Sequence, residues 1–253
     1  MPVILIEKPS PKLTIVTLNR PERRNALTLE MMNEFIAALK VASDEASERV
    51  LILRGAGAAF CAGLDLKAAT AQNSHATAEM VAKTMVALSQ TRLITIAAVH
   101  GAAVAGGAGI MSACDYVVAA ERTKIGYPEV RRGLVAGLVM TFLRRQVRER
   151  DIRELLFSGE IIDAQRAREM GLVNRVVPAA EVMSEAQKFA ESVLLGAPQA
   201  LVQTKRLLEE LWSTPVKDDV DLALKYHMEA RESAEAREGI AAFNEQRPPK
   251  WAV

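Results

Sequence analysis

The sequence predicts an α/β fold in which strands and helices alternate along the chain before an all-helical C-terminal part. Two β-branched runs, 3–7 and 13–18, flank a Pro-Ser-Pro turn and predict a pair of strands. Apolar residues then recur at helical spacing over 28–46, with Thr28 available as the N-cap. A similar order returns twice further along, so we expect repeated strand–strand–helix units.

The later units follow the same signals. Residues 50–53 predict a strand, and residues 94–99 predict another that enters a glycine-rich loop and then a helix. A strand at 116–119 leads past Ile125 to a helix from about Ala136.

From residue 179 onward the chain is rich in Ala, Leu, Glu, Lys and Arg at helical period, with Pro and Gly as breaks. We therefore expect a core over 1–195 and an all-helical oligomerisation region over 196–253, because such helices need an apolar surface from their own core or from a neighbouring subunit. The predicted helices cover 179–195, 198–212, 216–232 and 234–245.

Composition narrows the class of function. The chain has 253 residues, and its 32 basic and 31 acidic residues nearly cancel, so we expect neither nucleic acid nor a membrane surface as a partner. Two cysteines and three histidines are dispersed, which predicts no disulfide framework and no metal site. The first apolar run is too short for a signal peptide, and no run approaches the roughly 20 residues of a membrane span, so we expect a cytoplasmic protein.

Two loops of small residues follow strands: RGAGAAFCAGLDL at 54–66 and HGAAVAGGAGI at 100–110. The dinucleotide fingerprint fails at Phe60, and neither the phosphate-loop pattern nor the serine-hydrolase elbow occurs. Loops this bare allow two backbone N–H groups to approach one ligand atom, and a helix opening near Gly106 would add the positive end of its dipole. This arrangement predicts an oxyanion hole suited to a thioester carbonyl that becomes an enolate.

At these residues the sequence resembles the crotonase, or enoyl-CoA hydratase/isomerase, superfamily. The resemblance runs essentially end to end and rests on FCAGLDL (60–66), HGAAVAGGAGIMSACDYVVAA (100–120), YPEVRRGLV (127–135) and FNEQRPPKW (243–251). It implies a crotonase-like spiral, an acyl-CoA substrate and no separate cofactor, since coenzyme A is part of the substrate. It also implies that the N–H groups of Leu64 and Gly106 hold the thioester oxygen.

The resemblance further implies where coenzyme A lies. Arg24 and Lys67 form a cationic pair suited to its phosphates. The superfamily's trimers, often paired into hexamers, bring the C-terminal helix of one subunit over its neighbour's site, which implies Phe243 or Lys250 there. The remaining implied contacts come from the first loop and the segment after the first glycine motif: Ala26, Ala62, Leu64, Asp65 and Leu66.

Hydratases of this superfamily usually carry two glutamates, and only one has a counterpart here. The second is matched by Glu129, whereas the first position is Gly109, which the resemblance still implies as a substrate contact. We therefore expect Glu129 to move the proton while Leu64 and Gly106 hold the developing enolate during hydration of a 2-enoyl-CoA. One carboxylate also suffices for Δ3-Δ2 isomerisation, and a non-catalytic acyl-CoA binding protein is the alternative of another class.

Simpler structural interpretations stay open at several positions. Glu129 could be a solvated turn carboxylate, and Asp65 could be a helix cap. The glycines at 106, 107 and 109 could serve only tight packing. His100, Cys61 and Cys114 are expected to be structural, and the charged run 144–153 is expected to be a solvated helix face.

Overall fold

The computed structural model describes residues 2–68 and 74–251, and its largest element is a six-stranded sheet in the order β1-β2-β3-β4-β6-β9. β1 pairs antiparallel with β2, and every later pair in the sheet is parallel. The strands are β1 (Ile4–Ser10), β2 (Leu13–Leu18), β3 (Val50–Gly55), β4 (Ile94–Val99), β6 (Tyr116–Ala120) and β9 (Arg175–Val177).

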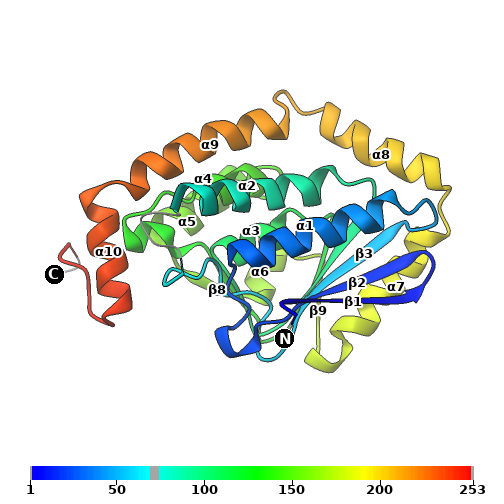
Figure 1. Cartoon of the computed structure of the whole chain (residues 1–253), viewed down its shortest axis with the longest axis horizontal. Coiled ribbons are helices and arrows are strands. Elements are labelled where there is room, and N and C mark those ends of the chain that lie inside the picture. The colour runs from blue at the N-terminus through cyan, green and yellow to red at the C-terminus, as the bar shows by residue number, and fades with distance from the viewer. Residues whose placement is uncertain (1, 69–73, 252–253) are drawn as a thin grey trace.

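Helices cover both faces of this sheet, which explains why its central strands are continuous apolar runs. Alternate residues of one strand enter different clusters: Leu51 packs with α1 (Leu29–Asp44) and α2 (Ser74–Gln90), whereas Ile52 packs with α7 (Val182–Leu194) on the opposite face. Figure 1 shows α1 and α2 on one side of the strands and α7 beneath them.

A second, three-stranded sheet lies beside the first and carries the loops of interest. Its order is β5 (Ala102–Val104), β7 (Lys124–Gly126) and β8 (Ile161–Asp163). The elements around it are α3 (Gly106–Ser112), the 3-10 turn η2 (Pro128–Arg132), α4 (Gly137–Leu143), α5 (Glu149–Ser158) and α6 (Ala164–Met170).

The predicted alternation of strands and helices is confirmed. The predicted cap is also present, since Thr28 Oγ1 accepts a hydrogen bond of 3.2 Å from the Met31 N–H. The helices α2, α5 and α6 were not predicted from the sequence.

The expectation for the charged run 144–153 holds for most of its charged residues, which are exposed, but is wrong for Asp151. The run spans the turn between α4 and α5, and Asp151 within it is buried. Asp151 accepts hydrogen bonds from Arg148 at 2.7 Å and from Arg166 at 3.4 Å, so the run includes an internal ion-pair network beside its exposed residues.

The C-terminal helices arch over the rest of the chain (Figure 1). They are α8 (Pro198–Glu210), α9 (Val216–Arg231) and α10 (Ala234–Asn244). α9 buries Val216 and Val220 against this chain's own α4 and α2, and α10 packs on η2.

α8 differs from its neighbours because none of its described residues is buried, and it leaves Leu207 and Leu208 exposed. The chain's own core therefore supplies the surface for α9 and α10. The predicted homotrimer or dimer of trimers, and the division at residue 195, stay predictions.

Among residues 2–68 and 74–251, no helix is long and apolar enough to cross a bilayer. The same described residues contain no group of three or more His, Cys, Asp or Glu side chains that could hold a metal ion. The cytoplasmic location remains a prediction.

Candidate active site

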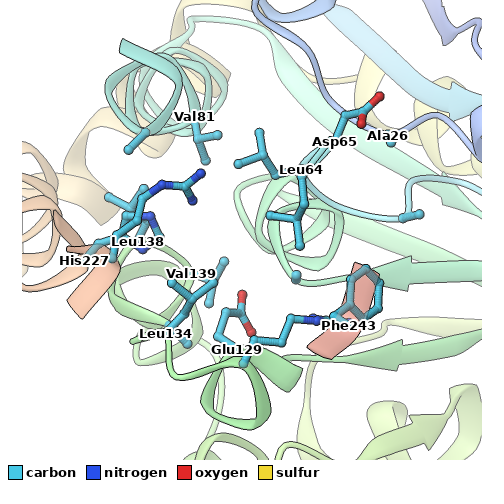
Figure 2. A pocket seen from close by; sticks show the side chains of 18 of the residues that line it. Ala26, Leu64, Asp65, Val81, Glu129, Leu134, Leu138, Val139, His227 and Phe243 are labelled. Carbon is cyan, nitrogen blue, oxygen red and sulfur yellow. The ribbon is translucent and has the colours of Figure 1, made fainter. Parts of the chain in front are cut away.

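A cavity of about 230 Å³ lies between the two small-residue loops, η2 and the C-terminal helices (Figure 2). Its walls come from segments far apart in the sequence: the loop before α1, the segment after β3, α2, α3, η2, α4, α9 and α10. Ten of the residues singled out by sequence line it: Arg24, Ala26, Ala62, Leu64, Asp65, Leu66, Lys67, Gly106, Glu129 and Phe243.

The backbone of Leu64 is held by a short parallel bridge to Leu27. The Leu27 N–H donates to the Gly63 carbonyl at 2.8 Å, and the Asp65 N–H donates to the Leu27 carbonyl at 3.0 Å. In such a bridge the intervening N–H, that of Leu64, points away from the partner strand. It donates no hydrogen bond within the described part of the chain.

Gly106 is the first residue of α3, so its N–H has no acceptor within the helix. A Cβ built on Gly106 would lie 3.9 Å from the Leu64 nitrogen, which brings the two candidate donors to the same wall. Close approach of the loops needs glycine at Gly63, because a Cβ there would lie 2.8 Å from the Val104 carbonyl oxygen and the residue has φ of +90°.

The packing interpretation holds for Gly107 but not for Gly106. A Cβ on Gly107 would lie 2.3 Å from the Cys61 carbonyl oxygen, so this glycine is required by loop packing. The nearest neighbour of a Cβ on Gly106 is Leu27 Cδ1 at 3.4 Å, and the residue faces the cavity. Packing alone therefore does not require glycine at position 106.

Ala105, the residue before Gly106, has an unusual backbone conformation with φ of 51° and ψ of −125°. A residue with a Cβ rarely adopts such a positive φ. The Ala105 N–H donates to the Gly126 carbonyl at 2.8 Å, and this bond to β7 helps to hold the turn that presents Gly106.

Glu129 lies on η2 and points into the cavity (Figure 2), where it is 8% exposed. This excludes the solvated-turn interpretation. Its Oε2 atom is buried and has no hydrogen-bond partner among the described residues. Burial raises the pKa of Glu129 to about 7, although its own backbone N–H and the Arg132 guanidinium act to lower it. The carboxyl group can therefore both accept and release a proton near neutral pH.

Gly109 does not line the cavity. A Cβ at this position would lie 2.3 Å from Met85 Cε and 2.6 Å from Val139 Cγ1, so the space next to α3 is already filled by side chains of α2 and α4. The predicted substrate contact at Gly109 is therefore not found in this structure, and a second carboxylate at this position would have no room.

One side of the cavity is formed by the loop before α1 and the segment after β3, and we call it the mouth. It is defined by three charged residues and one alanine: Arg24, Asp65, Lys67 and Ala26. Asp65 pairs with Arg20 at 3.2 Å, and its Oδ1 accepts from the Ala68 N–H at 3.3 Å. Asp65 thus caps a turn at 66–68 rather than the helix that the structural alternative expected, and it also lines the mouth.

Of the two residues implied near the C-terminus, one lines the cavity and the other does not. Phe243 lies at this chain's own cavity, where the Arg132 guanidinium sits 4.2 Å from its ring centroid, so no neighbouring subunit is needed to bring it there. Lys250 is outside the cavity, and its backbone N–H donates to Glu238.

The structural interpretation of His100 and the cysteines agrees with the structure. His100 Nε2 lies 2.9 Å from the Gly57 carbonyl oxygen, to which it donates. Cys61 and Cys114 are buried, and burial raises the pKa of both thiols to about 12. None of these three side chains lines the cavity.

A family model described as enoyl-CoA hydratase/isomerase matches residues 10–253. The chain belongs to the enoyl-CoA hydratase/isomerase family. It is therefore an acyl-CoA-processing enzyme with the fold of the crotonase superfamily.

Individual members of the family resemble the chain along its whole length. A Thermus thermophilus protein with an enoyl-CoA hydratase name is 39% identical, over 94% of this chain and 97% of that protein. An enoyl-CoA isomerase/hydratase, fer4 of Mycosarcoma maydis, is 31% identical, over 92% of this chain and 90% of that protein. The crystal structure of an enoyl-CoA hydratase from Mycobacterium avium superimposes with a TM-score of 0.88 at 30% identity, covering 98% of both chains.

The sequence analysis did not single out several residues that line the cavity, among them Arg132, His227 and Arg231. His227 and Arg231 lie on α9, about a hundred residues beyond Glu129. Their helical spacing marks one face of a helix, but nothing local in the sequence indicates that this face closes the cavity.

Proposed function

We propose that the enzyme hydrates a 2-enoyl-CoA to a 3-hydroxyacyl-CoA. The observation that carries the proposal is the buried Glu129 carboxyl, with an unpartnered Oε2 and a pKa raised to about 7, in one cavity with the Leu64 and Gly106 N–H groups. The hydratase names of the Thermus thermophilus and Mycobacterium avium relatives support it.

In this mechanism the Leu64 and Gly106 N–H groups donate to the thioester oxygen and stabilise the enolate that forms when water adds to C3. Ionised Glu129 accepts one proton of the water as its oxygen bonds to C3. The resulting acid then donates that proton to C2, which restores the carboxylate and the thioester carbonyl. One carboxyl group thus performs both proton transfers, and the sum is addition of one water molecule.

The filled space beside Gly109 favours a second candidate, Δ3-Δ2 isomerisation. Met85 and Val139 occupy the place where a further carboxylate would help to hold water. For isomerisation Glu129 would take a proton from C2 of a 3-enoyl-CoA and return it to C4, and no water is consumed. The isomerase/hydratase name of fer4 shows that a relative carries both descriptions.

Matched substrates separate these reactions in the native protein. We expect 2-hexenoyl-CoA to be hydrated, measured as loss of the enoyl absorbance together with formation of 3-hydroxyhexanoyl-CoA, at a higher kcat/KM than that for conversion of 3-hexenoyl-CoA. Isomerisation without hydration would overturn the proposal in favour of the second candidate. Tight binding of both thioesters without turnover would instead indicate the binding protein.

A further inference from the structure

The cavity has an apolar side and a polar end, both away from the mouth. In Figure 2, Val81, Leu138 and Val139 lie on the side opposite Asp65 and Ala26, and His227 of α9 lies at the far edge of that side. With coenzyme A at the mouth and the thioester beside Leu64, the acyl chain must run along this apolar wall toward α9. The inference rests on the proposed function for this placement of the thioester.

His227 is held in one tautomer by a backbone contact. Its Nδ1 lies 3.2 Å from the Val135 carbonyl oxygen, and because a carbonyl oxygen can only accept, Nδ1 carries the hydrogen. Burial lowers the pKa of His227 below its ordinary value and the Arg231 guanidinium acts in the same direction, although the Val135 contact acts to raise it, so the neutral ring predominates at pH 7. Nε2 is then an acceptor, and no hydrogen bond to it is found among the described residues.

Arg231 follows His227 by four residues, so both side chains lie on the same face of α9, and both line the cavity. A guanidinium can only donate, and the neutral His227 Nε2 can only accept. A hydroxyl group can contact both side chains at once, because its oxygen accepts a hydrogen bond while its hydrogen is donated. A methyl group would leave Nε2 desolvated without a partner. A carboxylate oxygen would place its lone pair against the lone pair of Nε2.

We infer that His227 and Arg231 form a hydroxyl-recognising subsite at the far end of the acyl cavity, so that the substrate class is a 2-enoyl-CoA with a hydroxyl group toward the end of its acyl chain. His227 accepts from this hydroxyl and Arg231 donates to it. Both are specificity-determining residues and take no part in the proton transfers at C2 and C3.

Saturated thioesters test the subsite without any reaction, because they can be neither hydrated nor isomerised. We would measure dissociation constants by titration calorimetry for hexanoyl-CoA, 6-hydroxyhexanoyl-CoA and adipoyl-CoA, and for shorter and longer homologues of each. At the chain length that reaches α9, the hydroxyl compound should bind about 10-fold more tightly than the alkyl compound, as expected for one buried hydrogen bond.

Variants assign this preference to His227. The ratio of the dissociation constants of the alkyl and the hydroxyl compound should fall to about one in His227→Leu. His227→Gln keeps an acceptor and should restore part of this ratio. His75→Leu is the matched control, because His75 is exposed on α2 and pairs with Glu79 outside the cavity, and its ratio should equal that of the native protein.

The proposal is overturned by a ratio near one at every chain length in the native protein, or by an unchanged ratio in His227→Leu. Tightest binding of the carboxylate series would also overturn it and indicate recognition of charge. A hydroxyl preference in binding without turnover of any enoyl-CoA would leave the subsite standing while the proposed function fails, so the two outcomes are distinguishable.

Discussion

The two elements that face the reacting end of the cavity, η2 and α3, contribute different chemistry. η2 supplies a side chain, the buried Glu129 carboxyl. α3 supplies only a backbone N–H from Gly106, because the side-chain space at Gly109 is filled by Met85 and Val139. In the proposed reaction, proton transfer would therefore depend on the single carboxyl group of η2, while α3 would act through its backbone alone.

Removing the Gly106 N–H tests the contribution of α3 to turnover. Gly106→Pro removes the N–H, and turnover should fall about 10²–10³-fold, as when one oxyanion donor is lost. Gly106→Ala is the control, because it keeps the N–H and its Cβ makes only ordinary contacts, with Leu27 at 3.4 Å and with the Gly63 and Leu64 backbone at 3.9 Å. Steady-state kinetics on folded proteins, checked by circular dichroism, would decide. Equal activities of the Pro and Ala variants would contradict this role for Gly106.

Adding a side chain at Gly109 of α3 should lower the free energy of unfolding. Gly109→Glu forces the new side chain against Met85 and Val139, and we expect unfolding free energy to fall by about 1–3 kcal/mol, as in overpacked cores. Met85→Ala should relieve the clash, so the double variant should lose less stability than the sum of the single variants.

In that double variant a second carboxylate has room to hold water, and hydration should rise relative to isomerisation. Met85→Ala alone is the control for both measurements. If the losses in unfolding free energy of the two single variants add up to that of the double variant, the filled-space explanation is wrong. An unchanged ratio of hydration to isomerisation would count against a water-holding role for the added group.

The burial of Glu129 predicts a pH dependence of stability. Its pKa rises from 4.5 to about 7 on folding, so the folded state binds this proton more tightly than the unfolded state does. The stabilisation is present below about pH 4.5 and is lost as pH rises toward 7, so this group should lower the unfolding free energy by about 1–3 kcal/mol across that range. Denaturant unfolding of native protein and Glu129→Gln at several pH values checks this, and parallel pH profiles would refute it.

The smallest effect concerns the turn before α3. Ala105 has a φ of 51°, which glycine adopts with less strain, so Ala105→Gly should change the unfolding free energy in the stabilising direction by no more than about 1 kcal/mol. A clear loss of thermal stability in this variant would show that the Ala105 methyl group contributes more than its backbone strain costs.

The local features of both walls could be predicted from the sequence. The strand before each bare loop, the start of α3 at Gly106 and the cap at Thr28 depend on nearby residues, and all three appear as expected. The candidate role of Glu129 came from the resemblance, since a single glutamate in a turn carries no chemical signal of its own.

Features that depend on distant partners could not be predicted. The filling of the space at Gly109 depends on α2 and α4, the burial of Glu129 depends on elements that pack around η2, such as α5 and α10, and the approach of His227 depends on how α9 packs. Asp151 lies in a run of charges that resembles a solvated face, but it is buried and pairs with Arg166 of α6, a contact that the local sequence does not indicate. Helical period indicates which residues share a face but not what that face meets.

The central claim is that one carboxyl group, Glu129, performs the proton transfers, and Glu129→Gln tests it most directly. The amide has nearly the same size, so the dissociation constant for a saturated acyl-CoA should stay close to the native value, while turnover of the best enoyl-CoA substrate should fall about 10²–10⁴-fold. Native turnover in a folded Glu129→Gln protein would contradict the account.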